Sequence, residues 1–252
     1  MISHPQLDKI ISLKTVDSTN LELKRKRKEF RGMNVLLMSD EQTHGKGQKG
    51  RTWASARNKG LWMSLHLGRE QTLAQDLQLL SLYAGLCVWN VLPRSAERNV
   101  ALKWPNDIFI GSKKVGGILT ELHWQGESVI SAIIGIGINM SQKKKEFPES
   151  IREKATSLSL EGIAGLERES LAQDFLNNFW EHFTQMGDGE LLADTWNQKA
   201  YLLGQLVQIE TTGGLLKGVF LGINSSGEAM ISSDKSMHTF QAGEIHLTRA
   251  SD

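Results

Sequence analysis

The feature that most constrains the fold is a pair of apolar runs, residues 115–122 and 129–140, both rich in branched side chains. Branched residues are favoured in β-strands because they pack well on a pleated surface. Turn chemistry at Gln125 and Gly126 separates the two runs. We therefore expect two adjacent antiparallel strands.

Shorter patterns predict further strands and helices. Residues 35–39 form an apolar run suited to a buried strand, and residues 61–67 alternate as a second strand does. Apolar residues at steps of three and four mark one helix over residues 73–91, which stops at Pro93, and another over residues 171–183.

A third helix is predicted near the amino terminus. Thr19, with Glu22 three residues later, has the spacing of a capping box, which opens a helix reaching about Glu29. Residues 24–28, near the end of this helix, are all basic. They form either an anion-binding patch or a solvated helix face, and the neutral total charge favours the solvated face.

From Gly204 onward, short strands alternate with glycine and serine turns, and no helical period remains. This pattern predicts a small β-barrel near the lower size limit for independent stability, which should dock on the rest of the chain. We therefore expect a mixed α+β domain over residues 1–200 and a small β-domain over residues 201–252.

Composition excludes several classes of protein. The 252 residues are 40% hydrophobic and 23% charged, as in an ordinary globular protein. The net charge of +1 is too small to attract nucleic acid or anionic membranes to the molecule as a whole. No run is long enough to cross a bilayer, and no signal peptide is recognisable. Cys87 stands alone and the histidines lack paired ligand spacing. We expect a cytoplasmic protein without a structural metal, and Cys87 in the core.

A glycine-rich loop carries the strongest functional signal. It follows a predicted strand and ends near Trp53. Its glycines let backbone N–H groups turn toward a phosphate, and its lysines and arginine supply positive charge. The loop therefore predicts an anion-binding site, against the alternative of a flexible surface loop. Its residues are Gly45, Lys46, Gly47, Gln48, Lys49, Gly50 and Arg51.

The same loop satisfies the G-x-G-x-x-G pattern of dinucleotide-binding proteins. That pattern requires a helix directly after the loop, whereas residues 53–60 have no apolar face and end in a turn. A nicotinamide-dependent oxidoreductase is therefore disfavoured.

Two further clusters place polar residues beside glycine-containing strands. Residues 103–107 predict a strand, a tight turn and a strand, and a run with paired glycines at 116 and 117 follows. Residues 135–139 alternate glycine with isoleucine and end at Asn139. Asp107 either bonds its own backbone or approaches a nucleotide-bound magnesium ion. Because glycines allow a close approach, the clusters together predict a concave site for a small flat molecule and a phosphate.

The order and spacing of five motifs resemble those of biotin-protein ligases. The end of the chain, residues 240–245, also resembles the end of that family's SH3-like domain, so the similarity spans nearly the whole chain. The resemblance implies an α+β fold, in which a mixed, largely antiparallel sheet with helices, of the class II synthetase-like type, precedes a small SH3-like β-barrel. The motifs are residues 17–20, 45–51 with Trp53, 103–107, 114–119 and 135–139.

The resemblance also implies a role for each site residue. A polar set around the ureido ring of biotin would discriminate against apolar analogues, because unpaired buried polar groups are costly. The implied catalytic residues are Lys114 and Lys46. The implied biotin-binding residues are Ser18, Thr19, Asn20, Gln42, Gly45, Lys46, Gly47, Gln48, Lys114 and Gly117. The implied nucleotide-binding residues are Lys49, Arg51, Trp53, Asn106 and Asn139, with Asp107 near Mg²⁺.

The implied reaction has two steps. The biotin carboxylate attacks the α-phosphorus of Mg–ATP, giving biotinoyl-5'-AMP and pyrophosphate, and a lysine of a biotin carboxyl carrier domain then takes the biotin. The Lys114 ammonium can offset charge on the phosphorus in the first step and on the departing AMP in the second. We expect a monofunctional ligase, monomeric or homodimeric, without specific DNA binding, because the 16 residues before Asp17 fall short of the roughly 50 that a domain needs.

The chain departs from the family pattern at several positions. Many members have arginine where this chain has Lys46 and Gln48. Lys46 keeps the positive charge but cannot form the two parallel hydrogen bonds of a guanidinium, and Gln48 carries no charge. Thr248 stands where some relatives have arginine, and Arg249 is displaced by one; neither is assigned a role. Two alternatives remain open: a lipoate or octanoate transferase of the same fold, which the glycine-rich loop disfavours, and a non-catalytic sensor of biotinoyl-adenylate, which Lys114 disfavours.

Overall fold

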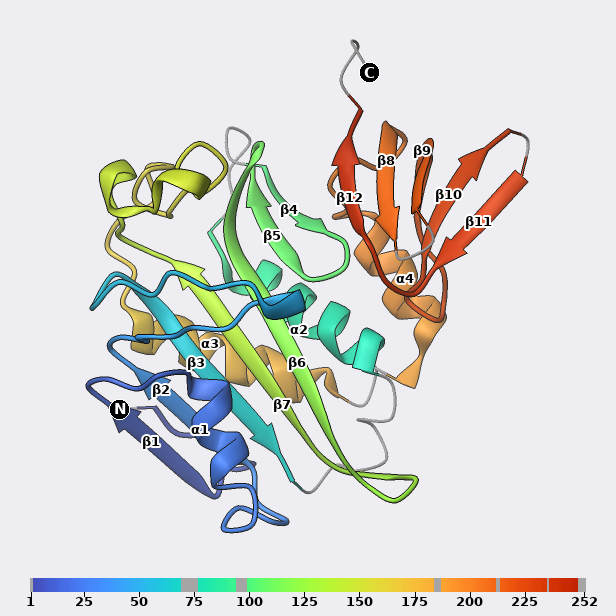
Figure 1. Cartoon of the computed structure of the whole chain (residues 1–252). Coiled ribbons are helices and arrows are strands. Elements are labelled where there is room, and N and C mark those ends of the chain that lie inside the picture. The colour runs from blue at the N-terminus through green and yellow to red at the C-terminus, as the bar shows by residue number, and fades with distance from the viewer. Residues whose placement is uncertain are drawn as a thin grey trace.

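The computed structural model describes residues 2–68, 77–93, 99–183, 187–211, 214–234 and 236–248. Within these ranges a seven-stranded sheet has the order β1-β2-β3-β7-β6-β5-β4. Helices pack on both of its faces (Figure 1). Its strands are β1 (Lys9–Leu13), β2 (Val35–Ser39), β3 (Gly60–Leu67), β4 (Val100–Lys103), β5 (Asp107–Ile110), β6 (Lys113–Gln125) and β7 (Ser128–Asn139).

The sheet is mixed but largely antiparallel. Strands β1 and β2 run parallel, and the other neighbouring pairs run antiparallel. The predicted pair of strands is confirmed as the long hairpin of β6 and β7, which turns at Gly126 and Glu127. Gly126 has a φ of 60°, a left-handed conformation that favours glycine. The expected fold class is confirmed.

Each face of the sheet has its own apolar core. Helices α2 (Leu77–Val91) and α3 (Arg168–Glu181) cover one face, and α1 (Thr19–Arg25) covers the other (Figure 1). Strand β2 contributes to both cores, because Leu36 and Met38 join the larger cluster while Val35 and Leu37 pack with α1. All five residues of β2 are buried, as the apolar run predicts.

The two longer helices follow their apolar stripes. The first is confirmed from Leu77 to Val91, while its predicted start at Leu73 lies outside the described residues. Cys87 is 1% exposed within the larger core, so its predicted core position is confirmed. The second stripe is confirmed by α3, whose aromatic residues Phe175 and Phe179 are fully buried.

The capping box predicted for the first helix is wrong. The helix begins at Thr19, but its N-cap is Ser18, whose side chain accepts from the Leu21 N–H. Glu22 forms ion pairs with Arg25 and Lys26 and does not close a capping box at Thr19. The helix also ends at Arg25, four residues before the predicted Glu29.

The basic run at the end of α1 is a solvated face. Lys24 pairs with Glu121 at 3.3 Å, and Arg25 pairs with Asp17 at 2.7 Å. The hydrogen bond from Arg25 lowers the pKa of Asp17 to about 2. Because these cations are exposed and already paired with carboxylates, the structure favours a solvated basic face over an anion-binding patch.

A five-stranded antiparallel sheet follows the last helix, α4 (Gly189–Asn197), in the order β11-β10-β9-β8-β12. This sheet fits the expected SH3-like domain. Its buried side chains join the same apolar cluster as the larger sheet, so the predicted docking is confirmed, while the proposed boundary at residue 200 stays a prediction. Its strands are β8 (Leu206–Thr211), β9 (Gly214–Ile223), β10 (Ala229–Ser233), β11 (Ser236–Phe240) and β12 (Glu244–Leu247).

Hydrogen bonds add to this docking. Trp104 Nε1 donates to Gly227 O at 3.0 Å from the turn between β4 and β5. At the end of α4, the Asn197 side chain donates to Ile223 O at 2.9 Å and accepts from Ile223 N at 2.7 Å. Buried bonds of this kind fix the smaller sheet relative to α4 and the larger sheet.

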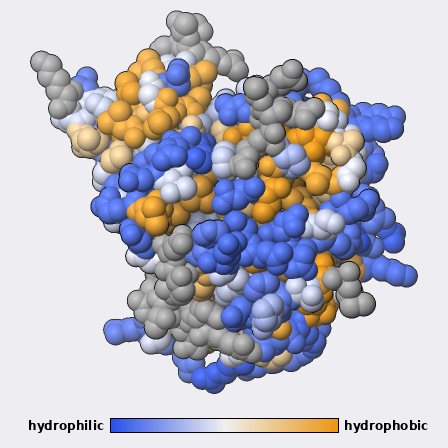
Figure 2. All heavy atoms as spheres, turned by 180° about the vertical axis from the view of Figure 1, so that it is seen from behind, coloured by the Kyte–Doolittle hydropathy of each residue, from blue (hydrophilic) through white to orange (hydrophobic). Residues whose placement is uncertain are grey.

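The surface is polar apart from local apolar areas. Seen from behind, hydrophobic residues gather on the smaller sheet, where Leu206, Leu215 and Met237 are more than half exposed (Figure 2). In the described part of the chain, no helix is long and apolar enough to span a membrane.

Candidate active site

One pocket gathers the residues that the sequence patterns single out. Its volume of about 510 Å³ lies within the range typical of small-molecule sites. Gly45 does not line the pocket. It packs against the chain at Trp53, where a Cβ would lie 2.5 Å from the backbone oxygen of Trp53. The predicted site residues that line the pocket are Ser18, Thr19, Asn20, Gln42, Lys46, Gly47, Gln48, Lys49, Arg51, Trp53, Asn106, Asp107, Lys114, Gly117 and Asn139.

Uncharged polar groups form one end of the pocket, at the start of α1. The Thr19 N–H donates to Gln42 Oε1 at 2.8 Å, and Gln42 Nε2 donates to Ser55 Oγ at 2.8 Å. Ser18 caps the helix and lines the pocket beside them. Hydroxyl and amide groups held in this way suit a neutral ring that carries both donors and acceptors.

The Asn20 amide lies deeper and is held by strand β6. Its Nδ2 donates to Leu119 O at 3.2 Å and to Glu121 Oε2 at 3.0 Å. A Cβ at Gly135 would overlap the Asn20 amide, so the glycine is required by the close approach of β7 to α1. Both protons of Nδ2 are therefore used within the protein.

Sequence analysis missed two serines in this polar group. Ser64 Oγ lies 2.6 Å from both Thr19 Oγ1 and Asn20 Oδ1, and Ser55 accepts from Gln42. Ser64 is a lone polar residue within the apolar run 61–65 of β3, and this break in the pattern was the available signal. Its partners lie 45 and 44 residues away in the sequence, so spacing alone did not identify them.

The glycine-rich loop folds back on itself and lines the same pocket. Gly47 N donates to Arg51 O at 2.8 Å, and Trp53 N donates to Gly45 O at 2.9 Å, on either side of a short 3-10 turn, η1 (Gln48–Gly50). Residues 51–59 contain no helix, which agrees with the rejection of a dinucleotide fingerprint. The exposed cations that the loop adds to the pocket are Lys46, Lys49 and Arg51.

The Trp53 indole lies against paired glycines of the two central strands. Gly117 of β6 faces Gly137 of β7, and a Cβ at Gly137 would come within 2.6 Å of Trp53 Nε1. At Gly117 a Cβ would lie 3.5 Å from the ring. Because these two positions carry no side chain, the aromatic ring can approach the backbone of the sheet closely. Within the described structure, the buried Trp53 Nε1 has no hydrogen-bond partner.

Lys114 is held by a carboxylate and an aromatic ring. Its Nζ lies 2.5 Å from Asp107 Oδ1 and 5.3 Å from the centroid of Trp53. A cation near a ring face is stabilised by the ring quadrupole. Lys103, which faces Asp107 across β4 and β5, also lines the pocket, and its burial lowers its pKa. Sequence analysis placed Lys103 in a cluster but assigned it no role.

Two asparagines predicted to contact a nucleotide make bonds within the protein. Asn106 Nδ2 donates to Ile118 O at 2.5 Å, which ties the turn before β5 to β6. Asn139 Nδ2 donates to Thr156 O at 2.9 Å, and its Oδ1 accepts from Gln142 Nε2 at 3.0 Å. Both residues line the pocket, but these bonds indicate that they shape its wall.

The residues present do not form a metal site of their own. Within the described ranges, no group of three or more His, Cys, Asp or Glu side chains is placed to hold a metal ion. Asp107, the predicted magnesium ligand, is paired with Lys114. A protein-held cation needs several oxygen ligands, so a magnesium ion would enter with the nucleotide substrate.

The smaller sheet contributes to the pocket through β12. Glu244 and His246 line it, and Glu244 forms an ion pair with Arg51 of the glycine-rich loop. The hydrogen bond from Arg51 lowers the pKa of Glu244. Thr248 Oγ1 is buried without a partner in the described structure, and Arg249 lies outside the described residues.

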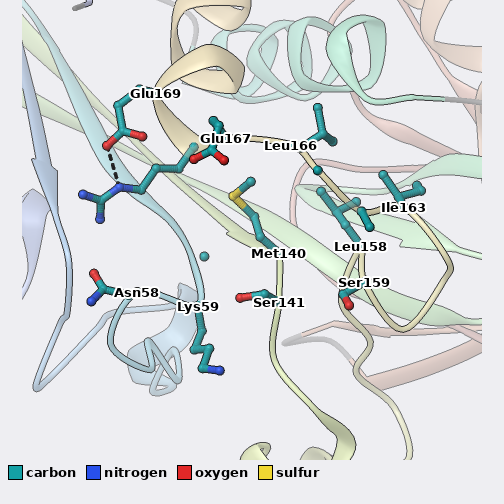
Figure 3. Close-up of a pocket in the computed structure, with 14 residues that line it drawn as sticks. Asn58, Lys59, Met140, Ser141, Leu158, Ser159, Ile163, Leu166, Glu167 and Glu169 are labelled. Atoms are coloured by element: carbon teal, nitrogen blue, oxygen red, sulfur yellow. Dashed lines mark hydrogen bonds and ion pairs between the residues drawn. The ribbon is translucent and has the colours of Figure 1, made fainter.

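A second pocket, of about 520 Å³, lies away from these residues. It is bounded by the ends of β3 and β7 and by the chain leading into α3 (Figure 3). Met140, Leu158 and Ile163 form its apolar side, while Glu167 and Glu169 stand near Arg168, which pairs with Glu169 at 2.7 Å. Its lining contains none of the predicted site residues.

Residues 12–139 match the model of the biotin/lipoate A/B protein ligase family. The chain belongs to this family. The match ends at the last residue of β7, so it covers the end of β1, all of β2 to β7 and the predicted site residues from Ser18 to Asn139. The resemblance drawn from the five motifs is thereby confirmed.

Curated members of the family include ligases with similar sequences. The chain is 34% identical over 215 residues to the bifunctional ligase/repressor BirA of Bacillus subtilis, covering 84% of this chain and 66% of that protein. It is 29% identical over 219 residues to the biotin--[acetyl-CoA-carboxylase] ligase of Mycobacterium tuberculosis, covering 84% of this chain and 79% of that one. The chain thus spans about two thirds of the length of the Bacillus relative.

Solved structures of the family share the complete fold. The biotin protein ligase from Aquifex aeolicus in complex with biotin and ATP superposes with a TM-score of 0.80 at 30% identity, covering 97% of this chain and 100% of that one. Since 97% of this chain is covered, the match includes the smaller sheet as well as the larger.

Proposed function

We propose that this chain is an ATP-dependent biotin-protein ligase. It forms biotinoyl-5'-AMP from biotin and Mg–ATP and transfers the biotin to a specific lysine of a biotin carboxyl carrier domain. Two relatives support this proposal: the Aquifex protein that was solved with biotin and ATP, and the Mycobacterium protein named biotin--[acetyl-CoA-carboxylase] ligase. The single cysteine, Cys87, fits a reducing cytoplasm, where we infer that the reaction takes place.

The observation that carries the proposal is that one pocket is lined both by uncharged hydroxyl and amide groups and by cations. Biotin has a neutral ureido ring at one end and a carboxylate at the other. Ser18, Thr19 and Gln42 would bind the ring, while Lys46 and Lys114 would offer positive charge to the carboxylate and to a phosphate. A pocket with both features binds the vitamin in one direction, with its carboxylate toward the cations.

In the first step, a carboxylate oxygen of biotin bonds to the α-phosphorus of ATP, and the bond from that phosphorus to the bridging oxygen breaks to release pyrophosphate. Negative charge builds up on the phosphorus oxygens in the transition state. Lys114 offsets this charge, because its ammonium is already oriented by Asp107 and Trp53 and needs little reorganisation. Magnesium arrives as part of Mg–ATP.

In the second step, the uncharged amine of the acceptor lysine attacks the carbonyl carbon of the adenylate. An amide bond forms, AMP leaves with the bonding electrons, and the amine loses a proton. Lys114 is placed to offset the charge on the departing phosphate. The loop cations Lys49 and Arg51 flank the same region and hold the nucleotide through its phosphates.

A transfer assay tests the proposal. The full chain is incubated with labelled biotin, Mg–ATP and a biotin carboxyl carrier domain, alongside a carrier whose acceptor lysine is replaced by arginine. We expect ATP-dependent label on the parent carrier and none on the arginine variant. Label from octanoate but not biotin would identify a lipoate-type transferase, and bound adenylate without transfer would identify a sensor; either result overturns the proposal.

A further inference from the structure

Ser64 buries a hydroxyl in the middle of the larger sheet. It lies on β3 and is 0% exposed, while neighbouring residues Met63 and Leu65 belong to the apolar core. A hydroxyl removed from water costs a few kcal/mol unless it is hydrogen-bonded. Ser64 therefore depends on partners, and its partners are two consecutive residues of the pocket.

These partners are Thr19 and Asn20, at the start of α1. Ser64 Oγ lies 2.6 Å from Thr19 Oγ1 and 2.6 Å from Asn20 Oδ1. Asn20 Nδ2 donates to Leu119 O and to Glu121 Oε2, which fixes the amide with its oxygen toward Ser64. One hydroxyl of β3 thus links two side chains of α1 that are otherwise held by other elements.

The number of protons determines the direction of these bonds. Asn20 Oδ1 has no proton, so Ser64 must donate its single proton to that oxygen. Ser64 Oγ also donates to Thr19 Oγ1 at 2.6 Å, so its proton is shared between Asn20 and Thr19. Thr19 Oγ1 in turn donates its own proton to Gln42 Oε1 at 3.0 Å, an oxygen that also accepts from the Thr19 N–H. Thr19 Oγ1 therefore uses its proton within the protein and keeps one lone pair for a ligand.

We propose that Ser64 is a positioning residue for recognition of the ureido ring. It fixes Asn20, whose amide protons are already used, and it holds the Thr19 hydroxyl, whose proton goes to Gln42, so that Thr19 Oγ1 accepts an N–H of the ring. Ser18 accepts from Leu21 N and keeps its own proton for the ring carbonyl. Asn20 then holds Ser64, and Ser64 holds Thr19, so that Thr19 makes the main contact with the ligand. This inference rests on the proposed function.

The test compares kinetic constants of three variants with those of the parent chain, in the ATP-dependent carrier assay. Ser64→Ala removes the hydroxyl with little change in volume. We expect the KM for biotin to rise about tenfold, the factor that one lost bond between buried groups corresponds to, while the KM for ATP and kcat stay within about twofold. Ser64→Thr restores the hydroxyl and should recover most of the biotin affinity. Ser131→Ala, a buried serine of β7 outside the pocket, serves as the control.

Three outcomes overturn the inference. In the first, the KM for biotin in Ser64→Ala stays at the parent value. In the second, the KM values for biotin and ATP rise together, as in a general loss of structure. In the third, Ser64→Thr does not recover biotin binding although its thermal midpoint matches that of the parent. A parent chain that transfers no biotin contradicts the proposed function itself, whereas failure confined to the Ser64 variants contradicts this inference alone.

Discussion

Single side chains in this molecule are oriented by groups that lie far away in the sequence. Lys114 is held by Asp107 and by the ring of Trp53, which itself lies against Gly117 and Gly137. A cation fixed in this way needs little rearrangement when charge develops near it, which is the basis of electrostatic catalysis. The role of Lys114 is therefore best tested by removing its ammonium group.

Lys114→Ala should slow pyrophosphate release by about a hundredfold to a thousandfold, the typical cost of removing one preorganised charge-stabilising group. The thermal midpoint should change little, because partly exposed ion pairs contribute at most about 1 kcal/mol. Stopped assays of pyrophosphate release measure the rate. Lys113→Ala, at the neighbouring position on β6 and outside the pocket lining, is the control and should keep the parent rate. Equal rates in parent and Lys114→Ala would refute the assignment.

His66 makes stability depend on pH. It is 1% exposed, and burial lowers its pKa below 6.5. Below pH about 6.5 the unfolded chain binds a proton that the folded chain resists, so the free energy of unfolding should fall as the pH drops. Urea titrations between pH 7.5 and 5 measure this fall. It should be smaller in His66→Gln, and His44→Gln, at an exposed position, is measured beside it as the control. Identical slopes in His66→Gln and the parent would be inconsistent with this account.

At the scale of elements, the apolar runs predicted the strands well because burial on both faces leaves few polar residues. Strand β2 was predicted with its observed bounds, and the hairpin of β6 and β7 followed from its branched residues and turn. The N-cap of α1 was predicted at Thr19, one residue too late. Ser18 and Thr19 both suit an N-cap, and only tertiary contacts decide between them. The Thr19 hydroxyl is engaged by β3, which leaves Ser18 as the cap.

The site could be predicted as a set of motifs but not as a network. Glycines and cations are visible in the sequence because they interrupt an apolar pattern or add charge to it, and most of those in the motifs line the pocket. The partners of Thr19 and Asn20 lie on another element, and Asn106 and Asn139 make backbone bonds that no local spacing encodes. Contacts between distant segments depend on the register of the sheet, which the sequence patterns did not specify.

The glycine-rich loop should become ordered when ligand binds. In the structure it is closed by a few backbone bonds of its own, and its cations are exposed, so it has little burial to restrain it. Hydrogen exchange over residues 45–60 should slow when biotin and Mg–ATP are added together. The hairpin turn at Gly126 and Glu127, which lies outside the pocket, serves as the internal control. Unchanged exchange in residues 45–60 would contradict the prediction.

At the scale of the whole molecule, the two sheets share one apolar cluster and one pocket. The pair between Arg51 and Glu244 joins the glycine-rich loop to β12, and Asn197 joins α4 to β9. The smaller sheet is near the lower size limit for independent stability, so we expect docking to stabilise it. The arrangement also places residues from both ends of the chain around the same pocket.

Because the core is shared, heat should unfold both sheets in a single transition. Asn197→Ala leaves the Ile223 backbone groups without their partners and should lower the free energy of unfolding by about 1–3 kcal/mol, still in one transition. Differential scanning calorimetry measures both quantities. Asn177→Ala, at an exposed amide of α3, is the matched control. Two separate transitions in the parent chain would contradict the shared core.

A single pocket is expected to bind both the vitamin and the nucleotide phosphate. The decisive experiment is a calorimetric titration of the parent chain with biotin and, separately, with a non-cleavable analogue of biotinoyl-adenylate. One molecule of each should bind per chain, and the analogue should bind more tightly because it brings a phosphate to the cations of the pocket as well as the vitamin. If neither compound gives binding heat, the pocket does not hold them and the proposed function is wrong.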